Sequence, residues 1–240
     1  MDPIATYVFL DLGANGLPED NCTPHIVSLS LLAVTSKDLR NIQEDTRQAK
    51  ISEPPVIRRK YCHSNNRNGQ LDLEAELREF IDHLNKPVCL ITYCGFYYDF
   101  PILKKWFSCT GTQFFEDMAC ADAMAGFYDI LCPKGEKTSR AARLVGEFPW
   151  PNMCEQSFAL EAVYHRVLED TRYYASGGDK FEDEVGFRNM AVVRIAVKLA
   201  EDFIPWLEKN CYKFSEVPLK PRPKFVHKHR EPVEVKKEIE

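Results

Sequence analysis

The chain has 240 residues, of which 45% are hydrophobic and 12% aromatic, with a formal net charge of −5 at pH 7. This length favours one sizeable domain with a core that needs no metals or disulfides. The acidic balance excludes a bulk electrostatic affinity for nucleic acid, so any such binding would need a local basic patch. The nine cysteines include no C-x-x-C pair, which indicates neither a disulfide framework nor a zinc knuckle. With no signal region or membrane-spanning run, we expect an intracellular protein, cytoplasmic or nuclear, without membrane contact.

The start of the chain predicts a β-hairpin. The apolar run "TYVFLDL" (6–12) is rich in β-forming residues and precedes the turn signal "GANGLPED", which predicts a strand ending near Asp11 and its exit loop. The segment His25–Val34 predicts the next strand, paired with the first. The polar stretch 35–68 is expected to hold one more edge strand and long loops.

The middle and the end of the chain alternate between helical and strand patterns. Apolar residues at helical spacing predict an amphipathic helix over 72–84, and "PVCLITYC" (87–94) predicts a strand buried on both faces. A helix is predicted to begin at Asp99, and a short strand is predicted before Asp122. Later helices, the second long and continuous, are predicted over 155–168 and 187–210. This order predicts an α/β fold with a mixed β-sheet flanked by α-helices.

The composition changes after Phe214. Residues 215–240 are rich in proline and charge and poor in large apolar side chains, which predicts a disordered tail after a domain formed by residues 1–214. The basic segment 220–230 is a candidate electrostatic arm, nuclear-import signal or docking site for protein partners. The order Val235-Lys236-Lys237-Glu238 also matches a short pattern for SUMO modification, which arises often by chance.

Two carboxylates have the placement that a two-metal nuclease requires. Such enzymes need several acidic side chains that converge on two divalent cations about 3.5–4 Å apart. Asp11 lies at the end of a predicted strand, Asp99 follows the buried strand over 87–94, and a late helix is available to reach across. The pattern indicates one site built from distant segments.

These segments resemble the DEDDh 3′→5′ exonucleases, and within them the TREX (three-prime repair exonuclease) branch. "VFLDLGANGLPED" is similar to the family's D-x-E-x-T/N-G-L-P strand, and "PVCLITYCGFYYDFPIL" is similar to its L-V-A-H-N-G-x-x-Y-D-F-P-x-L segment. "CADAM" and "SFALEAVYHRVL" match later family stretches. The resemblance covers about residues 5–212 in order, and it implies the RNase H-like version of the α/β fold.

The same resemblance implies a degenerate catalytic site. Asp11 and Asp99 match the family's first and third metal-binding acids. Gly13 stands at the position of the family's glutamate, and "EVGFRN" places Glu184 for the general-base histidine and Asn189 for the final aspartate. Glycine supplies no ligand, asparagine lacks the charge that Mg²⁺ prefers, and glutamate lacks histidine's pKa near neutrality. Tyr93 and Cys94 also stand where the family carries His-Asn.

Other interpretations of these acids stay open. The late cluster Asp179, Glu182, Asp183 and Glu184 is available to restore a metal ligand, although acids in a glycine-rich loop are usually only solvated. Asp11 and Asp99 are also explained as residues that stabilise a turn and a helix start. Asp122 is interpreted as a turn or N-cap residue.

Candidate nucleic-acid contacts are aromatic and basic. The run Phe96–Tyr98 offers rings on which bases can stack; Phe96 and Tyr98 are also explained as core residues, which leaves Tyr97 as the candidate. A predicted basic loop over 58–69 contributes Arg58, Arg59, Lys60 and Arg67. Its alternative is an ordinary solvated loop. Asp11 without a metal would repel a phosphate, which disfavours tight binding of nucleic acid at the position of the family's catalytic site.

The leading hypothesis is a catalytically inactive exonuclease-like protein, or pseudonuclease, that binds single-stranded DNA or RNA, protein partners, or both. We expect no cofactor, with Mg²⁺ or Mn²⁺ at Asp11 and Asp99 only if activity remains. One alternative is an active, divergent 3′→5′ exonuclease that uses the acids of 179–184. Another is a structural adaptor without nucleic-acid binding. The resemblance also implies a homodimer, through the segment 24–34 if that segment lies at an exposed sheet edge.

Overall fold

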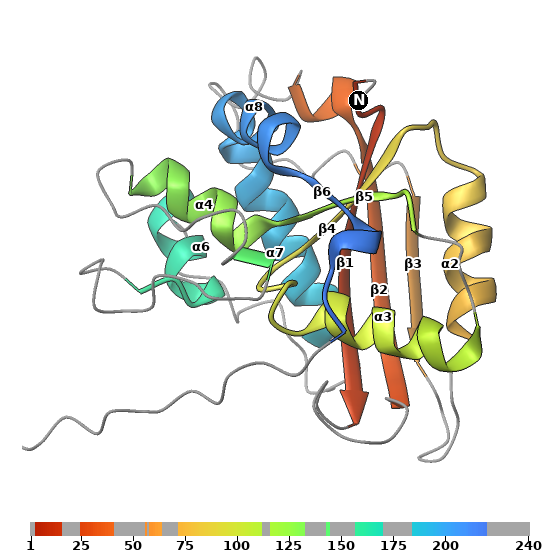
Figure 1. Ribbon diagram of the computed structural model, residues 1–240. Helices are drawn as coiled ribbons and strands as arrows, with labels where there is room; N and C mark the ends of the chain where they lie inside the picture. Colours follow the sequence, from red (N-terminus) through yellow and green to blue (C-terminus); the bar gives the residue numbers. More distant parts are fainter. Residues whose placement is uncertain are drawn as a thin grey trace, which may run out of the picture.

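The computed structural model describes residues 3–15, 25–40, 56, 58–63, 72–111, 116–132, 143–144, 157–169 and 184–219. These residues form a mixed β-sheet with helices on both faces (Figure 1). The predicted α/β class and the RNase H-like arrangement of sheet and helices are therefore confirmed. Among the helices described, none is long and apolar enough to cross a membrane.

The sheet has the strand order β3-β2-β1-β4-β5-β6. β1 pairs antiparallel with β2 and parallel with β4, and β5 is parallel to β4. The carboxyl ends of β1, β4 and β5 therefore lie at the same end of the sheet. Side chains at or just after these strand ends are brought together, as is usual for sites in α/β sheets. The strands run over Thr6–Asn15 (β1), His25–Thr35 (β2), Arg58–His63 (β3), Val88–Thr92 (β4), Ala119–Asp122 (β5) and Tyr212–Lys213 (β6).

Each face of the sheet is covered by its own set of helices (Figure 1). The apolar sides of α2 and α3 pack on one face, where side chains such as Leu77 and Phe100 are fully buried. The other face is covered by α4, α6, α7 and α8. The helices run over Leu73–Asp82 (α2), Asp99–Thr110 (α3), Ala123–Leu131 (α4), Leu160–Leu168 (α6), Glu184–Lys198 (α7) and Ala200–Asn210 (α8).

The first strand is longer than its sequence predicts. Instead of leaving the sheet after Leu12, β1 continues through Asn15, which pairs with His25, and an irregularity between Gly13 and Ala14 shifts the register. The turn-forming residues stay in the strand because β2 continues to pair with them. Asp11 therefore lies inside a strand rather than at its end.

The long helix predicted over 187–210 is two helices. α7 ends at Lys198 and α8 begins at Ala200, and Pro205 lies inside α8. Pro205 does not cause the break, because α8 continues through it; at the junction the carbonyl of Leu199 accepts from the N–H groups of both Asp202 and Phe203. The break lets α7 lie across β1 and β2 while α8 packs on α4.

The sheet topology corrects two predictions, the basic loop over 58–69 and the possible edge position of residues 24–34. Residues 58–63 of the predicted basic loop form β3, the outer strand beside β2. The segment 24–34, considered for edge pairing, forms most of β2 and lies between β1 and β3. The edge available on this side of the sheet is therefore that of β3.

The end of the domain packs on the sheet. After β6, the short 3₁₀ helix Phe214–Glu216 and Val217 follow, and Phe214 and Val217 are buried in the same core as α3. Residues 220–240, most of the predicted tail, lie outside the described residues, so their disorder stays a prediction.

Candidate functional site at the strand ends

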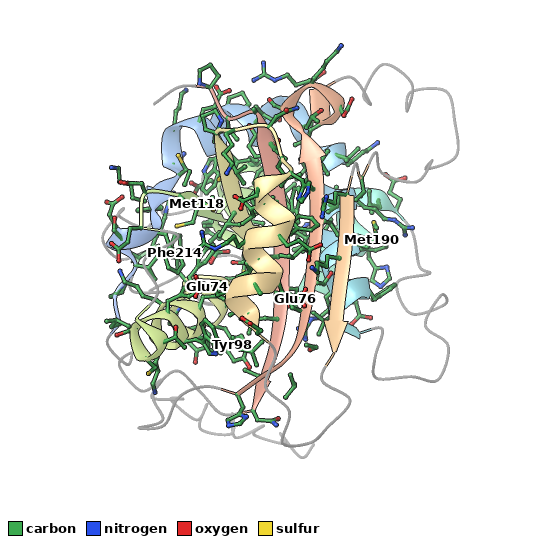
Figure 2. The ribbon with its side chains drawn as sticks, turned by 90° about the vertical axis from the view of Figure 1, so that its right-hand side faces the viewer. Glu74, Glu76, Tyr98, Met118, Met190 and Phe214 are labelled. Carbon is green, nitrogen blue, oxygen red and sulfur yellow. The ribbon has the colours of Figure 1, made fainter. Side chains whose placement is uncertain are left out.

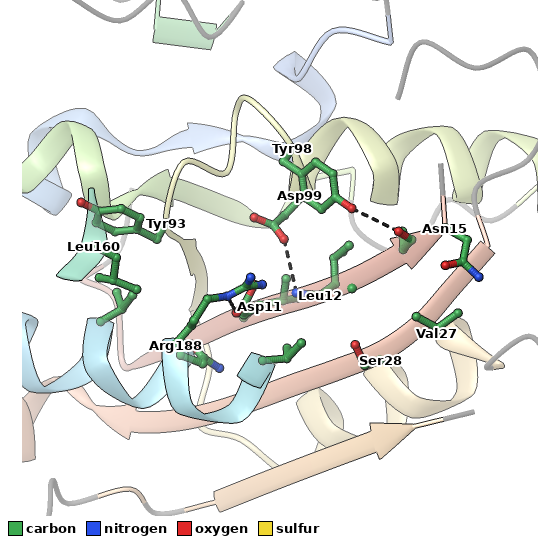
Figure 3. Close-up of a pocket in the computed structure, with 16 residues that line it drawn as sticks. Asp11, Leu12, Asn15, Val27, Ser28, Tyr93, Tyr98, Asp99, Leu160 and Arg188 are labelled. Atoms are coloured by element: carbon green, nitrogen blue, oxygen red, sulfur yellow. Dashed lines mark hydrogen bonds and ion pairs between the residues drawn. The ribbon is translucent and has the colours of Figure 1, made fainter. Parts of the chain in front are cut away.

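A cavity of about 510 Å³ opens beside the second half of β1 (Figure 3). It brings together four of the predicted site positions, although they are widely separated in sequence. Its walls come from β1, the start of β2, the start of α3, and α7, with Tyr93 and Leu160 at one end. The four predicted positions are Asp11, Gly13, Asp99 and Asn189.

Asp11 is bonded to an arginine that the sequence interpretation did not include. Arg188 of α7 donates from Nε to one carboxylate oxygen at 2.8 Å and from Nη2 to the other at 2.9 Å (Figure 3). This bidentate, charge-assisted geometry is among the stronger ion-pair arrangements in proteins. The Asp11 side chain is 17% exposed and that of Arg188 is 39% exposed, so solvent screens the pair only in part. Both oxygens of the first predicted metal ligand are thus engaged by a cation of the chain itself.

The guanidinium also opposes a metal electrostatically. Two unit charges about 4 Å apart interact by about 4 kcal/mol at the dielectric constant typical of a protein surface. A divalent cation bound to Asp11 would lie close to the Arg188 guanidinium and would meet about twice that repulsion. A metal at this place requires Arg188 to move away.

Asp99 is buried, and among the described residues it has one weak hydrogen-bond partner. It opens α3, its side chain is 3% exposed, and one carboxylate oxygen accepts from the Leu12 N–H at 3.3 Å. Burial, and then the nearby Asp11 charge, raise the pKa of Asp99 well above its ordinary value, against smaller opposing effects of the Leu12 N–H and Arg188. Asp99 therefore resists ionisation. Its neighbour Tyr98 donates a long hydrogen bond of 3.4 Å to the Ala14 carbonyl at the cavity wall.

The space beside Gly13 is filled by a neighbouring hydroxyl. A Cβ atom on Gly13 would lie 2.4 Å from the Oγ of Ser28, which is far inside van der Waals contact, and 3.7 Å from a methyl of Val185. Ser28 is itself 6% exposed and faces Gly13 across the β1–β2 pair. A glutamate at position 13 would therefore first require the Ser28 side chain to rotate.

Asn189 uses its amide to hold α7 on the sheet. Its Nδ2 donates to the carbonyl oxygen of Phe9 at 2.9 Å, and to the carbonyl and hydroxyl oxygens of Ser30 at 3.1 Å each. The side chain is 2% exposed. An aspartate here could not donate to these oxygens and would place its charge against two carbonyl groups. The amide of Asn189 thus has a packing role that an aspartate could not fill.

Asp122 is an N-cap, as interpreted from the sequence. One carboxylate oxygen accepts from the N–H groups of Cys94 and Met124 at 3.0 Å each, and the other accepts from Phe96 at 3.3 Å. Burial raises its pKa to about 6 although these N–H groups favour the charged form. Asp122 caps α4 and fixes the loop after β4, where Cys94 has a left-handed backbone (φ 62°). It does not line the cavity.

The described candidates for nucleic-acid contact, Arg58, Lys60 and Tyr97, do not line the cavity. Lys60 of β3 forms ion pairs with Glu76 and Glu79 of α2, and Figure 2 places Glu76 beside that strand. The guanidinium of Arg58 lies 5.3 Å from the Phe80 ring centre. Tyr97 is half-buried, and the aromatic residues that line the cavity among those described are Tyr93 and Tyr98. The side chain of Arg59 and the whole of Arg67 lie outside the described residues.

The late acids have no described position at the site. Glu184 is the first residue of α7, one turn before Arg188, but its side chain is outside what the structure describes. Asp179, Glu182 and Asp183 precede the described part of α7. Their proposed role in restoring a metal ligand stays a prediction.

Comparison with known proteins shows which proteins the chain is similar to. No family model matches the chain. It is 26% identical over 239 residues to "Three prime repair exonuclease 2" of Mus musculus, covering 88% of this chain and 91% of that protein. The human protein of the same name is 26% identical over 199 residues, covering 72% of this chain and 78% of the relative. The chain is a homologue of the three-prime repair exonucleases.

Two further matches are also to proteins named as nucleases. "Three-prime repair exonuclease 1" of Bos taurus is 26% identical over 192 residues, covering 69% of this chain and 56% of the relative. Among solved structures, the nuclease domain of 3′hExo, a DEDDh family member bound to rAMP, aligns with 10% identity and a TM-score of 0.48. That alignment covers 92% of this chain and 99% of the other.

The cavity of this exonuclease homologue does not fit the metal pair that a DEDDh site implies. Asp11 is bonded through both oxygens to Arg188, and Asn189 turns its amide nitrogen to backbone carbonyls. Within the described residues, no group of three or more His, Cys, Asp or Glu side chains is arranged to hold a metal ion. Hard divalent cations need several anionic oxygens, and this donor set offers too few.

Arg188 is the residue that sequence reasoning missed in this homologue. Its only signal is its place in "EVGFRN", directly before Asn189 and on the helix expected to reach across the site. An arginine at the start of a helix is usually a solvated surface residue. Its role depends on where α7 lies relative to β1, which the local sequence does not determine.

Proposed function

We propose that this homologue is catalytically inactive and binds single-stranded nucleic acid in the cavity beside β1. One observation carries the proposal: Arg188 engages both carboxylate oxygens of Asp11. A two-metal hydrolysis needs that carboxylate as a ligand, and the other positions offer no substitute among the described residues.

Two features of the cavity support binding without hydrolysis. Tyr93 and Tyr98 line it, and aromatic side chains stack on nucleic-acid bases with about 1–3 kcal/mol for each base. Arg188 also compensates the charge of Asp11, which removes the repulsion expected of a metal-free site. Because Arg188 is the one Lys or Arg side chain among the described residues that line the cavity, we expect modest affinity with a shallow salt dependence.

A degradation assay tests the proposal. The purified protein is incubated with end-labelled single-stranded DNA and RNA in Mg²⁺ or Mn²⁺, beside an Asp11→Ala/Asp99→Ala variant and the mouse relative as a positive control. We expect the wild type and the variant to leave the substrates equally intact. Degradation by the wild type that disappears in the variant would establish the alternative, an active divergent exonuclease.

Titration of the same oligonucleotides separates a nucleic-acid binder from an adaptor. We expect binding that weakens as salt increases, because at least one phosphate contact releases counterions. Binding that is absent at low salt would support the structural adaptor, which docks proteins through its surface or its tail (215–240).

We also propose that the chain forms a homodimer through the edge of β3. β3 is the outer strand on its side of the sheet, whereas β2 is enclosed between two strands. A proline at Cys62, which lies within β3, would disturb pairing along that edge if its N–H faces the partner. Light scattering after size-exclusion chromatography measures the mass, and a monomeric wild type would contradict the proposal.

A further inference from the structure

The positive charge bonded to Asp11 is the guanidinium of Arg188, a side chain of the protein rather than a metal ion. We propose that the guanidinium of Arg188 takes the place of the divalent cation, so that the cavity binds the phosphate backbone of a single strand without metal. The part of this inference that concerns nucleic acid rests on the proposed function. The part that concerns the cation does not.

The geometry of Arg188 meets the first requirement, which is a fixed position. Two hydrogen bonds of 2.8 and 2.9 Å hold its planar group against Asp11, and α7 is itself held on the sheet through the neighbouring Asn189. Arginine stays charged at all physiological pH values. The positive charge of Arg188 is therefore always present. The charge of a bound metal ion would instead depend on the concentration of that ion.

The cavity meets the second requirement, which is access. The Arg188 side chain is 39% exposed and lines the cavity together with Tyr98 and Ser28 (Figure 3). Among the described residues that line the cavity, the other ionisable side chains are Asp11 on β1, Asp99 at the start of α3 and the two tyrosines. A phosphate that enters meets a guanidinium with its paired carboxylate, rather than two uncompensated acids.

The replaced positions meet the third requirement, which is that a metal does not compete. The Oγ of Ser28 occupies the place where a side chain at Gly13 would begin, and the amide nitrogen of Asn189 faces backbone carbonyls. These two positions and Arg188 form a consistent set. Each one separately disfavours a metal, and Arg188 alone supplies the charge that a metal would have supplied.

The first experiment measures manganese binding directly, without any nucleic acid. Electron paramagnetic resonance of free Mn²⁺ is followed as wild type, Arg188→Ala and Asp11→Asn/Arg188→Ala are added. Lys198→Ala, which removes an exposed positive charge from the same helix outside the cavity, is the matched control. We expect weak binding by Arg188→Ala and none by the other proteins, because only that variant leaves the Asp11 carboxylate without its cation, while Gly13 and Asn189 still add no anionic oxygen. Equal manganese binding by the wild type, or none by Arg188→Ala, overturns the inference about the cation.

The second experiment measures the affinity for a fluorescein-labelled oligothymidylate in EDTA and in Mn²⁺. The wild type and Lys198→Ala should bind equally in both buffers. Arg188→Ala should bind about tenfold more weakly in EDTA and regain affinity in Mn²⁺, while Asp11→Asn/Arg188→Ala should bind about tenfold more weakly in both buffers, because it has neither the guanidinium nor the carboxylate that would hold Mn²⁺. A merely structural role for Arg188 would weaken both variants alike in both buffers, with no recovery in Mn²⁺.

The results separate this inference from the proposed function. A wild type that needs metal to bind the oligonucleotide, or an Arg188→Ala variant that matches it in EDTA, contradicts the substitution by Arg188. A wild type that binds no oligonucleotide in either buffer removes the nucleic-acid part, and the manganese titration then decides the role of Arg188. Degradation of the substrate contradicts only the proposed inactivity.

Discussion

Asp99 and Asp122 are both buried carboxylates at the same end of the sheet, yet their surroundings differ. Asp122 is 5% exposed and accepts hydrogen bonds from the backbone N–H groups of Cys94, Phe96 and Met124. Asp99 is 3% exposed and accepts one long bond, from Leu12. The first carboxylate organises a loop and a helix start, whereas the second has little local structure that depends on it.

This difference teaches how a structural acid can be told from the remnant of a site. A buried polar group that stabilises the fold is normally saturated with partners. Among the described residues, Asp99 has the Leu12 N–H as its one hydrogen-bond donor, and burial raises its pKa well above the ordinary value. A buried acid with few partners is what we would expect to remain in the proposed degenerate site.

The largest expected effect is the loss of the Asp122 carboxylate. Asp122→Ala leaves several buried N–H groups without an acceptor, so we expect the free energy of unfolding to fall by about 3–5 kcal/mol. Urea denaturation followed by circular dichroism measures it. Asp82→Ala, which removes an exposed carboxylate paired with Lys86, is the control and should change little. A loss for Asp122→Ala as small as that of the control would contradict the structural role of Asp122.

Restoring the acid at position 189 should also destabilise the fold. Asn189→Asp removes the donor that binds Phe9 and Ser30 and buries a charge against their carbonyl oxygens. We expect a loss of about 2–4 kcal/mol in the same denaturation experiment. The same change at the exposed Asn85 should have almost no effect. If Asn189→Asp is as stable as wild type, the fold tolerates an aspartate at position 189, and the packing role of the asparagine amide is contradicted.

The pH dependence of stability separates the contribution of Asp122. Its pKa in the folded protein is about 6, raised by burial from the ordinary value of 3.8. The folded state therefore holds this proton more strongly, and the stabilisation is complete below about pH 4 and lost as the pH rises through about 6. Subtracting the curve of Asp122→Asn from that of wild type should leave a fall of about 3 kcal/mol over this window. A difference curve that is flat, or that rises with pH, would show that this pKa shift is wrong.

The smallest effect is expected for Asp99. Because burial disfavours its charge, an amide at this position resembles the protonated carboxyl and still accepts from the Leu12 N–H. We expect Asp99→Asn to change the free energy of unfolding by no more than about 1 kcal/mol at neutral pH. A loss close to that of Asp122→Ala would mean that Asp99 has a structural role after all.

Much of the fold could be predicted from local patterns. Leu73, Leu77, Phe80 and Ile81 have helical spacing because one side of α2 faces the sheet, and β4 is apolar up to Thr92 because both its faces are covered. The capping role of Asp122 could be predicted because an N-cap depends on the residues next to it. Asp11 and Asp99 could be brought together because the family resemblance supplied the topology.

The remaining features depend on contacts between distant residues. Arg188 and Asp11 are 177 positions apart, and nothing in either segment indicates their contact. The extension of β1 through Gly13 depends on pairing with β2, which overrides the turn tendency of the local sequence. The pairing of Lys60 with α2 likewise depends on where β3 lies in the sheet.

The most direct measurement of the central claim is a crystal structure at the manganese absorption edge after soaking in Mn²⁺. We predict no anomalous peak in the cavity, with the guanidinium of Arg188 still bonded to both oxygens of Asp11. Two manganese peaks between Asp11 and Asp99, with Arg188 turned away from the carboxylate, would contradict this account.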